Sequence, residues 1–426
     1  MLKDVRLTRL NNGLMVATAP QPDAESAGVG IWIRVGGRYE SRETTGASHF
    51  IEHLLFKGTP TRSAQAISQA IEGRGGYLNA YTQEENTCYY ARLPHEYQFE
   101  AFDVLADMYL HAKLAPGDVD RERAVILEEL KMYRDQPQAV VQEQLAEAVW
   151  AGHPIGVPLA GNERSLAGLT RDALDAFRRT HYLPGRTIVA FAGRVDHDAC
   201  VARVEHTLAR LRGGGAARFR PVTAKTRQEK IRLTRREIEQ VHAAIGFRIP
   251  FSRHDRRRVA LRMLNTLLGE NMSSRLFQVV RERHGLAYSI HSTYQLFDDT
   301  GVLVIAAGLD SARADHATRL IAREIVRVRE KAVGAAELRR TKDYLLGSFR
   351  LGLEGTGGQL SWVGESLAQY GRLLDPDEFI DLVRSTSSED VRAVAETVFD
   401  PQRMTLSLVV PQKHPLDEAA WLKTLR

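Results

Sequence analysis

The sequence is poor in the residues that would build a cross-linked or membrane-embedded protein. Cysteine occurs twice in 426 residues, as Cys88 and Cys200. Two cysteines exclude a disulfide scaffold and a metal site made of thiolates alone, and they favour a reducing compartment. The longest apolar run covers residues 301–309, which is far short of the ~18 residues that a membrane-spanning helix needs.

A secretory signal is also missing from the N-terminal residues. The first eight residues, MLKDVRLT, contain no apolar core of the kind that a signal peptide requires. Together with the lack of a long apolar run, this predicts a cytoplasmic protein with no membrane partner.

The balance of charge is close to even. Lysine and arginine number 58 against 53 aspartates and glutamates, which leaves a net charge of +5. Nucleic-acid binding would require a clustered basic surface, so no nucleic-acid partner is expected. Hydrophobic residues make up 43% of the chain and charged residues 26%, as is usual for globular proteins and not for disordered ones.

The chain length alone suggests roughly three domains at about 150 residues each, but the composition changes clearly at one place. Gly213, Gly214 and Gly215 are followed by Pro221, and such residues interrupt regular structure. We therefore predict an N-terminal domain over residues 1–212, a linker over 213–227 and a C-terminal domain over 228–426.

The two halves repeat one order of elements: a helix, a glycine, a strand, an acidic turn and a second strand. Long helical segments follow in each half, and each half ends in a strand-like run. This order predicts an α+β fold with two structurally similar domains, each an antiparallel sheet with helices packed on one face. The predicted helices and strands of the repeat are 64–72, 77–82, 87–93, 121–134, 139–150 and 187–192 in the first half, and 275–283, 286–295, 302–307, 335–349, 358–370 and 403–410 in the second.

One short motif carries most of the chemistry: His49, Glu52 and His53 in the order H-F-I-E-H. On a helix, residues four apart differ by about 40° around the axis, so both imidazoles project from one side. Two histidines in that arrangement can bind one zinc ion. The order H-x-x-E-H is the inverted zincin signature, in which the carboxylate accepts a proton from a zinc-bound water. A solvated polar helix is the alternative, but the apolar run that follows indicates a half-buried helix whose polar groups need partners.

A third zinc ligand should come from elsewhere in the chain. The predicted helix 121–134 offers Glu122, Glu128 and Glu129. Glu122 and Glu129 are seven residues apart and lie on nearly the same face, whereas Glu128 points about 100° away. Taken alone, this helix could equally present a solvated acidic face.

The segment 46–59, GASHFIEHLLFKGT, together with Glu129 at 76 positions after His53, resembles the pitrilysin/insulinase family of zinc metallopeptidases. The chain length is similar to that of the short, two-domain members, which include mitochondrial processing peptidase and its bacterial relatives. The resemblance implies one Zn²⁺ per chain, bound by His49, His53 and Glu129. It also implies that Glu52 is the general base and that Glu122 is an auxiliary carboxylate behind the ligands.

Two further segments resemble the same family. In residues 75–90, Asn79 and Ala80 would hold an extended peptide substrate by main-chain pairing along an edge strand. In residues 273–290, Arg281 and Tyr288 would approach the scissile carbonyl and donate hydrogen bonds to a developing oxyanion. Without the resemblance, Asn79 would be a turn residue, Arg281 a surface residue and Tyr288 a core residue.

The function implied is that of a zinc-dependent endopeptidase that hydrolyses peptides or unfolded polypeptide segments inside a dimeric chamber. Because one chain carries both residue sets, a homodimer with composite sites is favoured over a heterodimer with a paralogous subunit. Two alternatives stay open: a non-catalytic partner or scaffold subunit of the same family, and a metal-binding module without hydrolytic activity.

Overall fold

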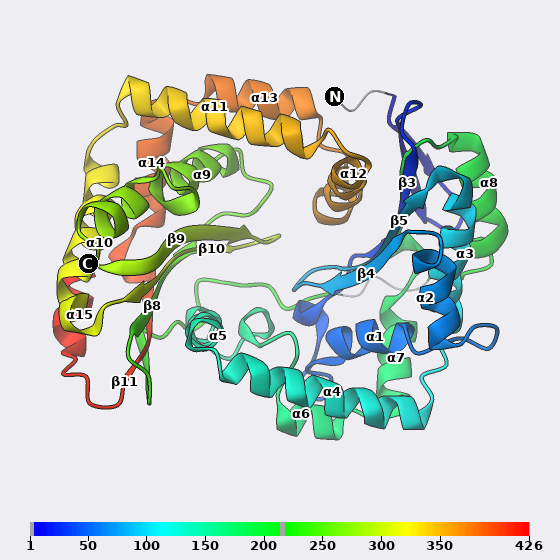
Figure 1. Ribbon diagram of the computed structural model, residues 1–426, viewed down its shortest axis with the longest axis horizontal. Helices are drawn as coiled ribbons and strands as arrows, with labels where there is room; N and C mark the ends of the chain where they lie inside the picture. Colours follow the sequence, from blue (N-terminus) through cyan, green and yellow to red (C-terminus); the bar gives the residue numbers. More distant parts are fainter. Residues whose placement is uncertain (1–3, 214–217, 426) are drawn as a thin grey trace. The chain divides into compact units, whose positions relative to one another are not determined.

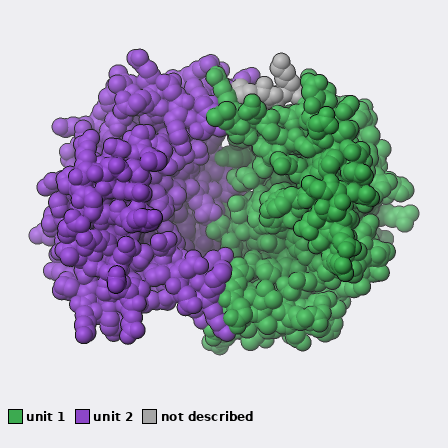
Figure 2. Space-filling view, in the orientation of Figure 1, with its two compact units in different colours: residues 1–130, 158–220, 349–376 green, residues 131–157, 221–348, 377–426 purple. Residues whose placement is uncertain are grey.

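The computed structural model describes residues 4–213 and 218–425, and the chain forms two compact units. The chain passes from unit 1 to unit 2 after Leu130, after Arg220 and after Pro376. The second of these places is inside the predicted linker 213–227, of which residues 214–217 lie outside the described residues. Figure 2 colours the two units green and purple. Unit 1 comprises Met1–Leu130, Pro158–Arg220 and Phe349–Pro376, and unit 2 comprises Lys131–Val157, Pro221–Ser348 and Asp377–Arg426.

The sheet of unit 1 has six strands among the described residues, in the order β1-β2-β6-β3-β5-β4. Figure 1 labels β3, β5 and β4 of this sheet. All neighbouring strands pair antiparallel except β2 and β6, which pair parallel. Strand β4 lies at one edge, so one side of its backbone has no strand partner in this sheet. The strands are β1 Arg6–Arg9, β2 Met15–Pro20, β3 Ser26–Ile33, β4 Tyr77–Thr82, β5 Thr87–Pro94 and β6 Thr187–Gly193.

The sheet of unit 2 has five strands among the described residues, in the order β7-β11-β8-β10-β9. Its neighbours also pair antiparallel except for one parallel pair, β7 with β11. The strands are β7 Ile231–Arg236, β8 Val241–Ile249, β9 Ala287–Leu296, β10 Gly301–Leu309 and β11 Met404–Pro411.

Helices surround both sheets. Those of unit 1 are α1 Ala47–Leu55, α2 Ala64–Glu72, α3 Gln98–His111, most of α4 Pro116–Arg134, α6 Glu163–Gly168, α7 Arg171–His181, α8 His197–Leu208 and α12 Thr356–Tyr370. Those of unit 2 are α5 Pro137–Val149, α9 Arg258–Asn265, α10 Ala314–Glu330, most of α11 Ala335–Gly352, most of α13 Pro376–Ser385, α14 Ser388–Val398 and α15 Glu418–Leu425, with π-helical segments at Thr266–Glu270 and Phe277–Arg283. Within the described ranges, every helix is too short or too polar to cross a membrane.

Both faces of the unit 1 sheet are buried. Alternate residues of a strand point to opposite faces, and in β3 Ile31 and Ile33 join the core that contains α1 and α3. Trp32, between them, points to the other face and packs with α12 residues such as Val363 and Leu367. This second face is therefore covered by a helix from the C-terminal half of the chain.

In unit 2, the second face of the sheet is covered by a helix from the N-terminal half of the chain. In β8, Ile245 belongs to the main core of the unit, whereas Ala244 packs with Val141 and Leu145 of α5. Unit 2 thus takes in residues 131–157 of the predicted first domain, and unit 1 takes in 349–376 of the predicted second domain.

The expected α+β class with two similar domains is confirmed, and the structure adds one feature. Each sheet carries helices on both faces and not on one, because both alternating residue sets of the central strands are apolar and both must leave water. The predicted helix 64–72 and strand 77–82 have the limits of α2 and β4.

The contact between α12 and the sheet generates a stability prediction. A Cβ atom on Gly364 would lie 2.4 Å from the ring of Trp32, which is fully buried. Gly364→Ala should lower the free energy of unfolding by about 1–3 kcal/mol because the overpacked ring must shift. Denaturant unfolding measures the change, and Gly347→Ala is the matched control, since nothing lies within 4 Å of its new methyl group. Equal stabilities of the two variants would contradict the packing described here.

Candidate metal centre

Helix α1 is held on the sheet by its apolar side. Phe50, Ile51 and Leu54 are fully buried in the core of unit 1. The helix begins after Gly46, whose φ of 91° is a left-handed conformation that glycine adopts at little cost. Because residues three or four apart share a side of a helix, this packing turns His49, Glu52 and His53 away from the deepest part of the core.

The N-terminus of α1 is capped by a residue from outside the helix. The carboxylate of Glu40 accepts hydrogen bonds from the backbone N–H groups of Gly46 at 2.7 Å and Ser48 at 2.8 Å. These bonds satisfy donors that a helix N-terminus leaves unpaired. A negative charge on this carboxylate is also favourable beside the positive end of the helix dipole. Burial raises the pKa of Glu40 to about 7.

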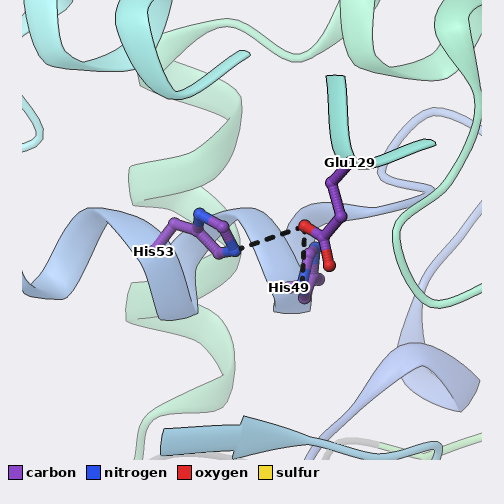
Figure 3. A group of neighbouring side chains, drawn as sticks. All are labelled: His49, His53 and Glu129. Atoms are coloured by element: carbon purple, nitrogen blue, oxygen red, sulfur yellow. Dashed lines mark ion pairs between the residues drawn. The ribbon is translucent and has the colours of Figure 1, made fainter. Parts of the chain in front are cut away.

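The two imidazoles of α1 and one carboxylate of α4 converge on one point (Figure 3). His49 Nε2 and His53 Nε2 each lie 3.8 Å from Glu129 Oε2, and one ligand atom from each residue falls within 4.8 Å of the others. Zinc binds nitrogen and oxygen at about 2.0–2.2 Å, so tetrahedral donors lie about 3.4 Å apart. The two histidine–glutamate distances exceed this value by about 0.4 Å, so the three side chains would have to move closer together around a zinc ion.

The protonation state of His49 also suits a metal ligand. Burial and, to a lesser extent, the neighbouring His53 lower the pKa of His49 to about 4. The ring is therefore neutral near pH 7, and a neutral imidazole has a free nitrogen lone pair for a metal.

Glu122 lies behind His53 and does not join the ligand cluster. Its Oε2 is 3.2 Å from His53 Nδ1, and its Oε1 is 2.7 Å from Lys57 Nζ. An acceptor at Nδ1 holds the ring with its proton on that nitrogen and leaves Nε2 free on the side of Glu129. Glu128 is exposed. Of the three glutamates that the sequence offered on this helix, Glu129 is therefore the one in the ligand cluster, Glu122 lies behind His53, and Glu128 lies at the surface.

Glu52 lies beside the cluster and contacts the edge strand. The hydroxyl of Thr82 on β4 donates a hydrogen bond to Glu52 Oε2 at 2.5 Å. Burial is the main influence on this carboxyl and raises its pKa above the ordinary value. The sequence analysis did not single out Thr82, although it lies two residues after Ala80 and so presents its side chain on the same face of the strand.

The open edge of β4 is partly occupied by its own side chains. The Ala80 N–H donates to Asn79 Oδ1 at 2.8 Å, and Asn79 Nδ2 in turn donates to the hydroxyl of Tyr77. An added strand would need this N–H, so the side chain of Asn79 would have to turn away before a strand could pair with Ala80.

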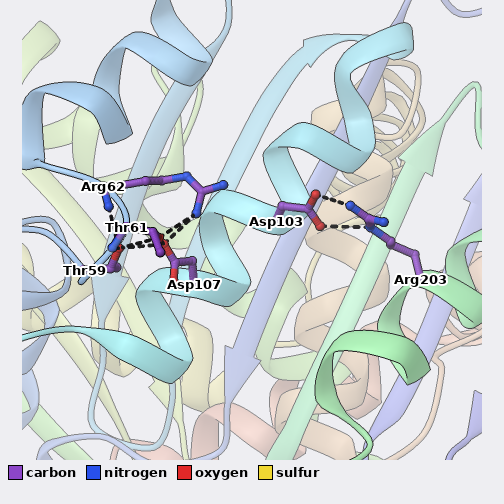
Figure 4. Close-up of polar contacts among 6 residues, drawn as sticks. All are labelled: Thr59, Thr61, Arg62, Asp103, Asp107 and Arg203. Carbon is purple, nitrogen blue, oxygen red and sulfur yellow. Dashed lines mark hydrogen bonds and ion pairs between the residues drawn. The ribbon is translucent and has the colours of Figure 1, made fainter.

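The segment that follows α1 is tied to α3 by a polar cluster (Figure 4). Asp107 accepts hydrogen bonds from Thr59 Oγ1 at 2.6 Å, Thr61 Oγ1 at 2.9 Å and Arg62 Nη1 at 2.6 Å. Three donors on one carboxylate satisfy a group that is itself buried, and they anchor the chain where it leaves the helix of the two histidines.

The second predicted residue pair lies in unit 2. Arg281 is in the π-helical segment Phe277–Arg283, and its guanidinium carbon is 5.6 Å from the ring centre of Tyr288 on β9. Tyr288 is 78% exposed, so it is not a core residue. The structure brings these two residues together as neighbours on the surface of unit 2.

Two family models match the sequence and together cover most of it. The model described as "Insulinase (Peptidase family M16)" matches residues 15–163. The model described as "Peptidase M16 inactive domain" matches residues 168–345. The three clustered side chains fall within the first match.

Similar proteins occur in several bacteria. A protein of Mycobacterium tuberculosis, named as an uncharacterized zinc protease, is 40% identical over 393 residues, which cover 92% of this chain and 90% of that protein. The uncharacterized zinc protease YmxG of Bacillus subtilis is 34% identical over 401 residues, covering 94% of this chain and 97% of YmxG.

Solved structures share the fold at lower identity. A protease from Helicobacter pylori superposes with a TM-score of 0.88 at 21% identity, covering 96% of this chain and 100% of that one. A structure described as a peptidase M16 inactive domain from Pseudomonas fluorescens gives a TM-score of 0.88 at 17% identity, with 96% and 98% covered. Both comparisons support the two-domain α+β fold.

The buried cap of α1 should make stability depend on pH. Because the pKa of Glu40 is raised from 4.5 to about 7, the folded state binds this proton more tightly than the unfolded state. The associated stability is present at low pH and is lost as pH rises through 7. When the pH is lowered from 8 to 5.5, the unfolding free energy of the wild-type protein should therefore rise by about 2 kcal/mol more than that of Glu40→Gln.

Urea unfolding in the presence of a chelator measures this difference without a contribution from bound metal. Glu72→Gln, which alters an exposed carboxylate at the end of α2, is the control and should keep the wild-type dependence. A pH dependence that is identical in wild type and Glu40→Gln would show that this carboxylate does not carry the effect.

Proposed function

The chain belongs to the insulinase (M16) family of peptidases, and from this premise we propose that it is a zinc-dependent endopeptidase acting on peptides or unfolded polypeptide segments. The convergence of His49, His53 and Glu129 carries the proposal. Three protein ligands leave a fourth coordination position open, as catalytic zinc sites do. One zinc ion per chain is expected.

The reaction combines the metal with the carboxylate next to it. When bound, zinc supplies Lewis-acid chemistry that polarises a carbonyl group and makes water more acidic. Glu52 takes a proton from the attacking water and later gives it to the leaving amine. Its raised pKa suits both steps, because a proton shuttle works best with a pKa near the working pH. The hydroxyl of Thr82 orients the carboxylate for this work.

The ligand geometry is maintained by residues that do not bind the metal. Glu122 holds the Nδ1 side of the His53 ring, and Lys57 compensates the charge of this nearly buried carboxylate. Outer partners of this kind orient ligands and increase metal affinity. Glu122 is therefore proposed as a positioning residue.

The substrate would bind as an additional strand. Strand β4 is an edge strand whose Ala80 N–H faces away from the sheet and is satisfied by a side chain that can turn away. Addition of a peptide strand relies on backbone hydrogen bonds, so it requires an extended chain more than a particular sequence. Asn79 and Ala80 are the residues proposed to hold it.

Arg281 and Tyr288 are proposed to contribute from the second half of the chain. A cation and a phenol can both donate hydrogen bonds to the oxyanion that develops at the scissile carbonyl. In the proposed homodimer, the pair of one copy completes the zinc site of the other copy. A heterodimer with a paralogous subunit would divide these roles between two different chains.

A non-catalytic subunit is the second candidate, and the description of the model that matches residues 168–345 as an inactive domain favours it. However, the histidines and the glutamates of the candidate centre all lie between residues 49 and 129, outside that match. An inactive second domain is compatible with an active first one, so we retain the endopeptidase.

Substitution of the proposed general base separates the two functions. Glu52→Gln should keep about one zinc per chain and lose cleavage of a quenched fluorescent peptide by a factor on the order of 10²–10⁴, because it removes the proton acceptor and no metal ligand. Metal analysis and the cleavage rate are measured on the same samples. Glu128→Gln, which changes an exposed carboxylate on α4, is the control.

The wild-type protein decides between the alternatives. Zinc without cleavage of any peptide in a diverse pool would favour a metal-binding module. Absence of zinc would favour the scaffold, and undiminished cleavage by Glu52→Gln would refute the assigned base.

Mixing two inactive variants tests the composite site. Arg281→Ala and Glu52→Gln should each be inactive, and co-refolded mixtures should recover about a quarter of the wild-type activity. A random dimer is mixed in half of the cases and then has one intact site of two. If heterodimers are confirmed by differential tags and no activity returns, completion by a second copy is wrong.

A further inference from the structure

An open cavity of about 860 Å³ lies within unit 1 at the beginning of β4. Its wall is formed by the loop before β3 (residues 21–26), by Tyr77 of β4 with Arg92 of the paired strand β5, and by the start of α12 (residues 354–359). A volume of this size is typical of ligand sites. It lies at the opposite end of β4 from Thr82 and on the face of the sheet that α12 covers. Tyr77 shares this face with Tyr81, whose hydroxyl contacts Trp32 and Glu365, whereas Thr82 points to Glu52 of α1 on the other face.

The cavity is acidic and has an aromatic side chain at its wall. The lining contains three carboxylates, those of Asp23, Glu25 and Glu354, and one guanidinium, that of Arg92. Its net formal charge is therefore −2. All three acidic residues are exposed, and no ion pair of their carboxylates occurs within residues 4–213 and 218–425. Tyr77, which is 52% exposed, offers an apolar surface beside them. The chemistry matches a long, positively charged side chain, whose stem is apolar and whose end is cationic.

The cavity continues the edge along which a peptide would pair. The hydroxyl of Tyr77 accepts a hydrogen bond from Asn79, and Asn79 accepts one from the Ala80 N–H. A strand rises by ~3.3 Å per residue, so Thr82, beside Glu52, is about 17 Å from Tyr77 along β4. A peptide whose scissile bond lies level with residues 80–82 would reach the cavity about three to five residues further on.

The direction of the peptide follows from the pairing. The other neighbour of β4 is antiparallel, and antiparallel pairing is the more stable arrangement per residue. An antiparallel peptide has its C-terminal part next to the N-terminal end of β4. Those residues after the scissile bond whose side chains point to the face of α12 would therefore enter the cavity.

We propose that this cavity is a specificity subsite for a lysine or arginine side chain located about three to five residues C-terminal to the cleaved bond. The inference rests on the proposed endopeptidase function and extends it. Asp23, Glu25 and Glu354 supply the charge that selects such a side chain, and Tyr77 supplies contact for its aliphatic part.

A lysine scan of one quenched fluorescent peptide tests the subsite. The cleaved bond is first located by mass spectrometry, and single lysines then replace alanines at each of the six positions on either side. For wild type, kcat/KM should rise about threefold to tenfold for lysine at a position three to five residues after the bond, as expected for a partly exposed charge pair repeated across several carboxylates. Arginine should act like lysine at that position, and glutamate should lower kcat/KM.

Charge-neutralised variants assign the effect to the cavity. In Glu25→Gln/Glu354→Gln, the ratio of kcat/KM for the lysine and alanine peptides should fall to about one. Asp172→Asn removes an exposed carboxylate of unit 1 outside the cavity, and it should keep the wild-type ratio. Fluorescence anisotropy with labelled peptides and Glu52→Gln provides the same comparison as a binding measurement.

The outcomes separate the two inferences. Cleavage with equal rates for lysine and alanine at these positions, or a preference that persists in the double variant, would overturn the subsite and leave the endopeptidase standing. A preference on the N-terminal side of the bond would overturn the direction on which the subsite depends. Absence of cleavage of every peptide would overturn the endopeptidase and the subsite with it.

Discussion

The burial of one side of α1 is the constraint on which the candidate centre depends. Phe50, Ile51 and Leu54 have no exposed surface, so the helix cannot rotate about its axis without opening the core, which is close-packed like that of other proteins. A shift of one residue turns a helix by about 100°, and in one direction it would bring Phe50 and Leu54 to the positions of the two histidines. Because both histidines come from this one helix, the helix itself fixes their separation, and its packing on the sheet decides where they lie relative to Glu129. The buried cap by Glu40 and the Asp107 cluster fix the two ends of the segment.

The exchange of helices between the halves has a consequence for the whole chain. Unit 1 is completed by α12, which the chain reaches after residue 355, and unit 2 is completed by α5 from the first half. Trp32 of β3 would otherwise present its ring to water, and burial of a side chain of this size contributes about 2–3 kcal/mol. The sheet on which the candidate centre is built therefore needs residues from both halves. A fragment that ends at the linker would leave an apolar face of unit 1 uncovered.

Much of this arrangement could be read from the sequence. The four-residue spacing of His49 and His53 requires a helix to bring them together, and the helix is present. The run 187–192 is apolar at every position, which indicates a strand buried on both faces, and all of β6 is buried. Periodicity shows that a face is apolar but does not say which helix covers it, so the exchange of α5 and α12 could not be predicted.

Thr82, Lys57 and Glu40 were missed for a related reason. Each contacts the centre or its helix through tertiary packing, and no local spacing marks a single threonine, lysine or glutamate.

The edge strand combines two demands that usually conflict. An unpaired edge can join strands of other chains and aggregate, yet addition of a peptide strand needs such an edge. In β4 the side chain of Asn79 occupies the outward N–H of Ala80 and is itself held by Tyr77. One outward backbone donor, the Ala80 N–H, is thus satisfied by a reversible hydrogen bond, and a pairing peptide would have to replace that bond. Only an extended segment offers a continuous row of backbone donors and acceptors, since the strands of a folded protein have already used theirs. In the proposed endopeptidase, this edge would therefore favour unfolded polypeptide segments over folded proteins, and the hydrogen bond from Ala80 to Asn79 would hinder pairing with other strands.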